Sequence, residues 1–277
     1  MIIDGKALAN TVYEKLAQAM VHFPRTPQLD IVIVGDNPVV ERFVRIKESA
    51  AKKLNIAVVL HRFTDAITEE ALKEEIVNIG KHDACDGVIV QLPLPSSMNV
   101  QAVLDVIPVN KDVDMLSTTG VALFRDEKAL IIPPVAGAVK EILDSANIKV
   151  HGEEVLVLGF GQLVGKPVSI LMRHNGAHVT VVDKPIADLA LHVRDALVVI
   201  SGTGSPSLVT KEMILGRHIL IDAGTSESGG KLVGDIDPAA ASVAALFTPV
   251  PNGVGPVTVA MLMRNLCILA RARSEGK

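Results

Sequence analysis

Short aliphatic runs alternate with longer amphipathic segments along almost the whole chain. The runs have the length and composition of buried strands, and the segments between them place apolar residues at helical spacing. Strands that alternate with helices are typical of βα units, which build a parallel sheet with helices on its faces. The pattern therefore predicts an α/β fold.

The expected strands cover residues 29–34, 56–61, 87–91, 155–159, 178–182, 196–201, 218–223 and 245–248. The expected helices cover residues 6–21, 39–54, 69–81, 100–106, 136–147, 165–174, 186–193 and 256–272. Residues 92–149 contain no expected strand, so the strands form two groups. This division predicts two α/β domains: residues 1–125 together with 256–277, around a small parallel sheet, and residues 126–255. We expect the active site in a cleft between them, where a cofactor and a substrate can meet.

Charge and aromatic content exclude some partners. Lys and Arg number 27 and Asp and Glu number 31, a formal net charge of -4 without long blocks of one sign, which argues against a basic nucleic-acid surface. The chain has no Trp, six Phe and a single Tyr, Tyr13, so aromatic platforms that stack single-stranded bases are not expected.

Cysteine usage and hydropathy indicate the compartment. Cys85 and Cys267 are too few for a disulfide framework and lie in no metal-binding spacing, so we expect a reducing compartment and no metal. The first residues lack the charged segment followed by an apolar run of a signal peptide, and no apolar run approaches the length of a membrane span. The sequence therefore predicts a cytoplasmic protein with no membrane partner.

A glycine-rich turn follows the strand expected at residues 155–159. Gly159, Gly161 and Gly165 suit a tight turn and the close approach of a pyrophosphate to a helix N-terminus, although the spacing is GxGxxxG and not GxGxxG. The next strand ends at Asp183, where an acid commonly binds the ribose hydroxyls of a dinucleotide. We therefore interpret the second domain as a Rossmann-type NAD(P)-binding domain. The alternative is a turn whose glycines serve packing alone, with Asp183 as a solvated loop residue.

Asp183 also bears on the choice of cofactor. A carboxylate at the ribose position repels the additional phosphate of NADP. If the turn binds a dinucleotide, we expect NAD in preference to NADP.

A second candidate site includes Lys47, which the i, i+4 spacing places on the same face of a helix as Phe43. Partial burial there lowers the pKa of a lysine and suits it to proton transfer. The alternative is a lysine whose stem merely covers apolar surface. Gln91 ends an expected buried strand, where it either orients a ligand or the lysine or satisfies loop backbone groups. Asp114, in a Lys-Asp-Val-Asp loop, is either functional or solvated.

Several segments together resemble one family. They lie at residues 43–47, 90–95, 111–115, 133–136, 159–167 and 249–258. In this order they are similar to the Tyr-x-x-x-Lys helix, VQLPLP strand end, KDVDG loop, PCTP turn, Gly-Arg-Ser loop and PVPGGVGPMT loop of the bifunctional methylenetetrahydrofolate dehydrogenase/methenyltetrahydrofolate cyclohydrolase family. The resemblance spans nearly the whole chain.

The resemblance implies roles for individual residues. Lys47 corresponds to the catalytic lysine, Gln91 to the amide that positions it, and Asp114 to the carboxylate that binds the pterin ring. The substrate-binding residues implied are Phe43, Val90, Leu92, Pro93, Pro251 and Gly253. The cofactor-binding residues implied are Gly159, Phe160, Gly161, Gln162, Gly165, Asp183, Lys184, Gly202, Thr203, Gly224 and Thr258. Members oxidise a tetrahydrofolate derivative with a nicotinamide cofactor, hydrolyse the product to formyltetrahydrofolate, and are typically homodimers.

The chain departs from the family pattern at the folate site. Phe43 replaces a tyrosine, so the phenol near the lysine is missing and water attack suffers more than hydride transfer. Met115 and Asn252 replace glycines, and residues 134–136 read Pro-Val-Ala for Cys-Thr-Pro.

At the cofactor loop, Phe160 and Gly161 replace an arginine and a serine, and Asp183 and Lys184 replace the histidine and serine of the family. Losing a phosphate-binding arginine while gaining an acid favours NAD over NADP.

Three functions remain open at this point. The first is an NAD-linked methylenetetrahydrofolate dehydrogenase with weakened or lost cyclohydrolase activity. The second is a fully bifunctional enzyme, in which Lys47 and Gln91 suffice without the phenol. The third is a non-catalytic folate- or nucleotide-binding paralogue, which has to account for the presence of Lys47, Gln91 and Asp114.

Overall fold

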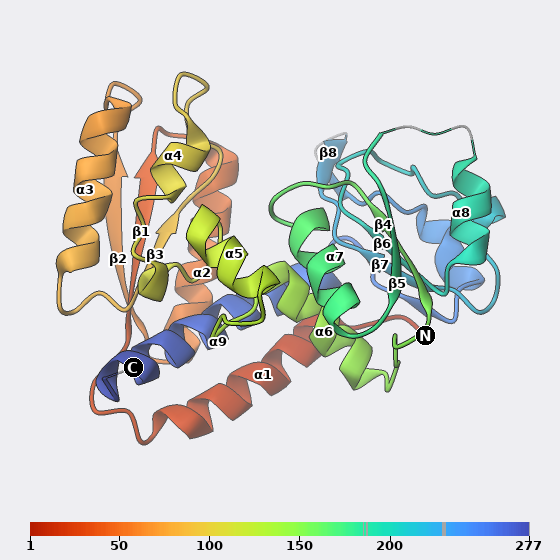
Figure 1. Cartoon of the computed structure of the whole chain (residues 1–277), viewed down its shortest axis with the longest axis horizontal. Coiled ribbons are helices and arrows are strands. Elements are labelled where there is room, and N and C mark those ends of the chain that lie inside the picture. Colours follow the sequence, from red (N-terminus) through yellow and green to blue (C-terminus); the bar gives the residue numbers. More distant parts are fainter. Residues whose placement is uncertain (185, 187, 229–230, 277) are drawn as a thin grey trace. The chain divides into compact units, whose positions relative to one another are not determined.

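The computed structural model describes residues 1–184, 186, 188–228 and 231–276 of the chain. They pack as two compact units. Unit 1 contains residues 1–10 and 135–258, and unit 2 contains residues 11–134 and those from 259 onward. Each unit is built on its own parallel sheet, which confirms the expected α/β class (Figure 1).

The sheet of unit 2 has three parallel strands in the order β2-β1-β3. These are β1 (Gln28–Val34), β2 (Ala57–Phe63) and β3 (Gly87–Val90). Their register pairs Val32 of β1 with His61 of β2 and with Val90 of β3. The chain leaves β1 for β2 on one side and returns to β3 on the other, so the topological switch point lies between β1 and β3. Ligand sites of parallel sheets collect at the carboxyl ends of strands at such a point.

Helices cover both faces of this sheet. They are α2 (Pro38–Lys53), α3 (Glu69–Lys81), α4 (Val100–Leu104) and α5 (Thr118–Arg125), with a short 3-10 turn, η1 (Val109–Lys111). Leu72 and Ile76 of α3 pack with Val32 and Val88 in one buried cluster, whereas α2 lies on the opposite side of the sheet from α3 (Figure 1). Asn37 begins α2 by accepting the Val39 N–H, and Thr68 begins α3 by accepting the Ala71 N–H.

The sheet of unit 1 has five parallel strands in the order β10-β7-β6-β4-β5. These are β4 (Glu154–Leu158), β5 (His178–Val182), β6 (Val198–Ser201), β7 (Ile219–Asp222) and β10 (Leu246–Phe247). A small antiparallel pair joins β8 (Ser226–Ser228) to β9 (Lys231–Val233). The chain goes from β4 to β5 on one side and to β6 on the other, so the switch point lies between β4 and β6.

The helices of unit 1 are α7 (Gly165–His174) and α8 (Leu189–Asp195), with the 3-10 turns η2 (Lys211–Met213) and η3 (Pro238–Ser242). Val193 of α8 packs with Leu156, Val199 and Leu220 on one face of the sheet, and α7 covers the other face (Figure 1). This is the doubly wound arrangement expected from alternating strands and helices.

Three helices contain the points at which the chain passes from one unit to the other. They are α1 (Gly5–Met20), α6 (Pro134–Ser145) and α9 (Val254–Ser274). By length and composition, α9 is the one helix of the described part that is apolar enough to cross a membrane. More than half of its apolar stretch is buried inside the protein, as in the core helix of a soluble protein.

Some elements differ from the sequence expectations. The helix α5 and the β8–β9 pair were not expected, because α5 opens with Thr-Thr-Gly, which has low helix propensity, and β8 and β9 are each only three residues long. The helix expected at residues 186–193 is observed as Leu189–Asp195, and residue 187 of that range lies outside the described residues.

The compact units also differ from the expected division in two places. The first ten residues belong to unit 1, where the Ile3 N–H donates to the Phe247 carbonyl. The chain passes from unit 2 to unit 1 at residues 134–135, whereas the expected boundary lay near residue 125. Asn265 of α9 donates to the Ile132 carbonyl at 2.8 Å, and this contact keeps the stretch before residue 135 in unit 2. Which residues make up each functional domain remains a prediction.

A buried carboxylate joins three segments of unit 2. Asp86, whose side chain has no exposed surface, accepts two hydrogen bonds from Arg25, at 2.5 and 2.8 Å, and one from the Gln28 N–H at 3.0 Å. Arg273, in the last turn of α9, lies 3.6 Å from the same carboxylate. Asp86 therefore connects the start of β3 to the start of β1 and to the end of α9.

We expect Asp86→Ala to destabilise the protein by about 2 kcal/mol or more, since it leaves a buried N–H unpaired and removes a bidentate ion pair. Urea-unfolding curves followed by circular dichroism measure the change. Asp83→Ala is the matched control, because the Asp83 side chain is fully exposed, and its effect is expected to stay within about 0.5 kcal/mol. Equal effects of the two substitutions would contradict this role for Asp86.

Candidate functional site

Lys47 and Gln91 meet at the carboxyl end of the sheet in unit 2. The Lys47 Nζ donates to the Gln91 Oε1 at 2.7 Å. Lys47 comes from the helix that follows β1, and Gln91 comes directly after β3, so the contact lies at the switch point of this sheet. The structure thus brings together two residues that the sequence singled out separately.

The orientation of the Gln91 amide is determined by its second contact. Its Nε2 donates to the Leu92 carbonyl at 3.0 Å, which directs the Oε1 toward the lysine. A carbonyl oxygen can only accept, so it takes an N–H from the lysine whether the amine is charged or neutral. Gln91 is therefore suited to hold the amine in place in both protonation states.

Burial and one nearby carboxylate control the charge of Lys47. Burial lowers the pKa of Lys47, and the negative charge of Asp114 partly opposes this effect. Burial likewise raises the pKa of Asp114, while Lys47 lowers it and the charge of Asp112 raises it further. Lys47 and Asp114 are thus electrostatically coupled in a poorly solvated place, as groups that transfer protons often are.

The other two charged residues of the Lys-Asp-Val-Asp loop have structural contacts. The buried Lys111 Nζ donates to the carbonyls of Gly80 and His82 at the end of α3, at 2.6 and 3.1 Å. The buried Asp112 carboxylate accepts the N–H groups of Leu116 and Ser117 before α5. Burial raises the pKa of Asp112, and these hydrogen bonds oppose the change. Asp114 is the acid of this loop that remains partly exposed.

The backbone of this loop has an unusual conformation at Met115. Met115 has φ +54°, in the left-handed region that favours glycine, and is buried. Asn252, the other residue that replaces a family glycine, has φ +80°. Both residues therefore have a backbone conformation that glycine favours, although neither is a glycine.

A residue that sequence reasoning missed supports the same loop. Asn265 of α9 is completely buried, and its Nδ2 donates to the Val113 carbonyl at 3.0 Å, next to Asp114. The sequence shows it only as one polar residue within the apolar pattern of the last helix. The contact with Val113, distant in sequence, could not be read from that pattern.

Phe43 and Tyr13 lie at different places in unit 2, as the sequence suggested. Phe43 lies one helical turn before Lys47 and is 39% exposed. Tyr13 instead contacts Lys53, whose Nζ lies 5.2 Å from the centre of its ring, and burial raises the pKa of Tyr13 to about 12. The single tyrosine of the chain is thus engaged with the last turn of α2, so it does not replace the phenol that Phe43 lacks.

The other expected substrate-binding residues divide into three groups. The Val90 side chain is packed in the core of unit 2, and its assignment to the substrate remains a prediction. Pro93, after a cis peptide bond with Leu92, is exposed, and Leu92 is half-buried. In the loop before α9 in unit 1, Pro251 follows a cis peptide bond with Val250 and is exposed, and Gly253 is buried.

Unit 1 has a cavity of about 290 Å³ at its own switch point. Its apolar walls come from Leu158, Val182, Ile186, Leu189 and Leu208. Of the expected cofactor-binding residues, those that line it are Gly159, Phe160, Gly161, Asp183, Lys184, Gly202 and Thr203. Ser205 completes the lining and was not expected from the sequence.

The glycine-rich turn beside this cavity needs two of its glycines for backbone reasons. Gly159 has φ +86°, and a Cβ there would lie 2.7 Å from the Gly202 carbonyl oxygen. A Cβ at Gly165 would lie 2.0 Å from the Gly159 carbonyl oxygen, so Gly165 allows the helix start to pack against the turn. Gly165 therefore shapes the cavity without lining it.

Asp183 is held beside the turn by a backbone contact. The Phe160 N–H donates to the Asp183 Oδ1 at 2.8 Å. Both residues are exposed at the edge of the cavity, and the Lys166 Nζ lies 5.7 Å from the centre of the Phe160 ring.

Three other expected cofactor-binding residues do not line the cavity. Gln162 lies in the exposed part of the turn. The Gly224 N–H donates to the Asp222 Oδ1 at 3.0 Å, and the Thr258 Oγ1 donates to the Val254 carbonyl within α9. Their assignment to the cofactor remains a prediction.

The cavity fits the adenosine and phosphate part of a dinucleotide. Its apolar walls suit a base, the Asp183 carboxylate suits a ribose diol, and the glycine turn leads into the N-terminus of α7, which suits phosphate. A Cβ at Gly161 would meet no atom within 4 Å, so space remains beside the turn.

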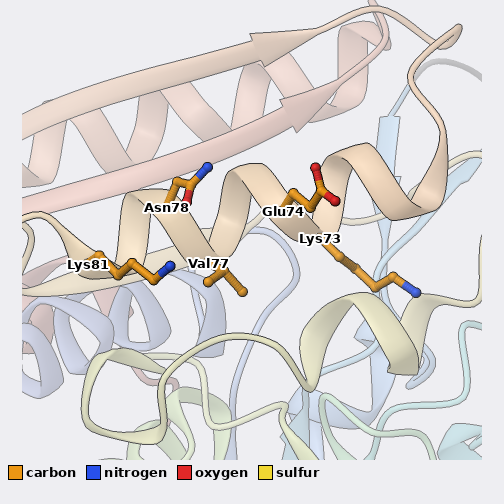
Figure 2. Close-up of a pocket in the computed structure, with 5 residues that line it drawn as sticks. All are labelled: Lys73, Glu74, Val77, Asn78 and Lys81. Carbon is orange, nitrogen blue, oxygen red and sulfur yellow. The ribbon is translucent and has the colours of Figure 1, made fainter.

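A second depression of about 380 Å³ lies on α3 (Figure 2). Figure 2 shows that its lining residues all project from this helix: Lys73, Glu74, Val77, Asn78 and Lys81. Lys73 already pairs with Glu69 at 3.0 Å. None of the expected site residues lines this depression, and we assign it no function.

Comparisons with known proteins agree with this description. The family model described as "Tetrahydrofolate dehydrogenase/cyclohydrolase, catalytic domain" matches residues 3–114, and the model of the NAD(P)-binding domain of the same family matches residues 133–274. The bifunctional protein FolD of Hydrogenobaculum sp. is 37% identical over 267 residues, which cover 95% of this chain and 96% of that relative.

Solved structures give the same result. The bifunctional FolD enzyme of Campylobacter jejuni superposes with a TM-score of 0.94 at 30% identity, covering 99% of both chains. The Trypanosoma brucei FolD enzyme, solved with NADP and an inhibitor, has a TM-score of 0.93 at 35% identity, covering 100% of this chain and 99% of that chain. Matched over nearly its whole length, the chain belongs to the tetrahydrofolate dehydrogenase/cyclohydrolase family.

Proposed function

We propose that this protein oxidises methylenetetrahydrofolate to methenyltetrahydrofolate, with NAD as the preferred cofactor and with weakened or lost cyclohydrolase activity. The observation that carries the proposal is the half-buried Lys47 amine, hydrogen-bonded to Gln91 and coupled to Asp114. These are the residues that the family resemblance implies for folate chemistry. A bound nicotinamide supplies the acceptor for the hydride of the methylene carbon.

The residues of unit 2 bind and orient the folate in this proposal. Asp114 accepts hydrogen bonds from the pterin ring, and Lys47 lies beside the reacting carbon. The burial that lowers the pKa of Lys47 increases the fraction of neutral amine, which is the form that takes a proton from an attacking water. Gln91 holds the same amine in position while its charge changes.

The absence of a phenol at position 43 supports the weakened hydrolysis. The Phe43 ring can pack against a ligand, but it can neither donate nor accept a hydrogen bond in the way a tyrosine hydroxyl does. Water attack needs proton transfer at that place, whereas oxidation mainly needs the folate to be positioned. A fully bifunctional enzyme, the second candidate, would use the same Lys47–Gln91 contact for hydrolysis without a phenol, and the accumulation of methenyltetrahydrofolate distinguishes the two.

The preference for NAD is supported by the edge of the nucleotide cavity. The Asp183 carboxylate lies where a ribose diol would bind, and its charge would repel a phosphate on that ribose. Lys184 lines the same cavity and acts in the opposite direction, so the cofactor titration described below measures which charge dominates.

Two further expectations accompany the proposal. We expect a homodimer, as the family resemblance implies, and a cytoplasmic location, as the two unpaired cysteines suggest. Sedimentation of the purified chain measures the first directly.

We expect methenyltetrahydrofolate to accumulate when the protein is given methylenetetrahydrofolate and NAD, because hydride transfer outpaces hydrolysis. Reduced cofactor and methenyl absorbance are followed together, and decay of added methenyl substrate is measured separately. Phe43→Tyr is expected to speed that decay several-fold, since it restores a hydroxyl one helical turn from Lys47.

The controls for this assay test whether the Lys47 site is responsible. Lys47→Met is expected to lower whichever activity is present by more than roughly tenfold. Lys52→Met, at an exposed position of the same helix, is the matched control and is expected to leave both rates unchanged. Rapid hydrolysis without accumulation supports the bifunctional alternative, and no turnover with either NAD or NADP supports the non-catalytic paralogue.

We expect a higher kcat/KM with NAD than with NADP. Asp183→Ser is expected to shift the ratio toward NADP by roughly tenfold, because removing the carboxylate relieves about 1–2 kcal/mol of repulsion at close range. Asp188→Ser, an exposed acid outside the cavity lining, is the control. A wild-type preference for NADP, or a ratio unchanged by Asp183→Ser, would rule out this account of cofactor choice.

A further inference from the structure

The loop that follows β6 forms one wall of the nucleotide cavity. Gly202, Thr203 and Ser205 all line the cavity directly after the strand ends at Ser201. Such a wall binds a ligand well only if its backbone is held in one place, because ordering a loop at the moment of binding costs affinity. The contacts that hold this loop therefore matter for the cofactor.

One carboxylate behind the loop supplies most of these contacts. Asp235 is completely buried, and its Oδ2 accepts hydrogen bonds from the Thr203 N–H at 2.7 Å, the Thr203 Oγ1 at 3.0 Å and the Ser201 Oγ at 2.7 Å. Asp235 itself does not line the cavity. It contacts the loop on the side away from the cavity.

Asp235 is in turn held by its neighbours. The Asp222 Oδ1, at the end of β7, accepts the Asp235 N–H at 3.1 Å, and its Oδ2 accepts the Ile236 N–H at 2.8 Å. Gly224 makes room for the carboxylate, since a Cβ there would lie 2.2 Å from the Asp235 Cγ. Gly224, which the sequence placed among the cofactor-binding residues, thus packs against the Asp235 carboxylate.

The arrangement is poorly suited to stability alone. The Asp235 Oδ1 is buried and has no hydrogen-bond partner among the described residues, and burial raises the pKa of the neighbouring Asp222 to about 6. Two buried acids side by side are costly, and apolar side chains of similar size often stabilise a fold at least as well. An apolar side chain cannot accept the two hydrogen bonds from Thr203 and the one from Ser201 that hold this loop.

We propose that Asp235 is a positioning residue for the cofactor: it holds the Gly202–Thr203 wall of the cavity in its binding conformation. Its substitution then weakens nucleotide binding while leaving the reacting groups of unit 2 unaffected. The role is independent of which folate reaction the protein performs and of whether NAD or NADP is preferred.

The test measures binding and turnover separately in the full-length protein. Isothermal titration with ADP-ribose and with NAD is expected to give dissociation constants at least roughly tenfold higher for Asp235→Ala, since it removes three hydrogen bonds. The kcat at saturating cofactor is expected to stay within about threefold of wild type. Asp235→Asn retains a carbonyl oxygen that accepts from Thr203, and it is expected to restore binding to within about threefold.

Two controls separate positioning from general stability. Asp237→Ala removes the hydrogen bond to the Ala239 N–H two residues further along and is expected to lower stability without changing either dissociation constant. If Asp235→Ala does not fold, Ser201→Ala removes one donor to the carboxylate without touching the cavity, and it is expected to weaken ADP-ribose binding about two- to fivefold.

Unchanged ADP-ribose binding in a folded Asp235→Ala or Ser201→Ala protein would overturn the proposal. Loss of binding in Asp235→Asn as severe as in Asp235→Ala would also overturn it, because the hydrogen bonds to Thr203 would then not be what matters. Since ADP-ribose binding requires no folate, failure of the proposed dehydrogenase activity leaves this test intact.

Discussion

The chemistry proposed for unit 2 depends on one electrostatic constraint, the burial of a Lys47 amine that is hydrogen-bonded to an amide and influenced by the charge of a carboxylate. Burial favours the neutral amine, the Asp114 charge favours the ammonium, and the Gln91 carbonyl accepts from either form. The three side chains come from a helix, a strand end and a loop, so the fold has to bring them together. It does so at the switch point of a three-stranded sheet, where β1 and β3 both end.

Around both switch points, buried carboxylates hold loops by accepting backbone N–H groups. Asp112 does so before α5, in the same loop as Asp114, and Asp222 and Asp235 do so behind the nucleotide cavity. Each of these acids is almost completely buried. A carboxylate that accepts several N–H bonds fixes the path of a loop more tightly than packing alone, because hydrogen bonds are directional. The partly exposed Asp114 and the exposed Asp183 are thereby placed on loops of defined shape.

The sequence predicted the strands and most helices, because these follow from periodicity, and it named candidate site residues from glycine spacing and local motifs. It identified Lys47, Gln91 and Asp114 separately, and the structure showed the contact between the first two. It did not predict the roles of Asn265 or Asp235, since each contacts a segment far away in sequence. The burial of the Val90 side chain was not predicted for a related reason: a motif names a residue without showing which way its side chain points.

The pKa of Lys47 is the most direct test of this account, and NMR of isotopically labelled lysine side chains can measure it in the full-length protein. The account predicts a pKa below the ordinary lysine value of about 10.4, and a further decrease in Asp114→Asn, because that substitution removes the one charge that favours the ammonium. An ordinary or raised pKa of Lys47, or a value that Asp114→Asn leaves unchanged, would contradict it.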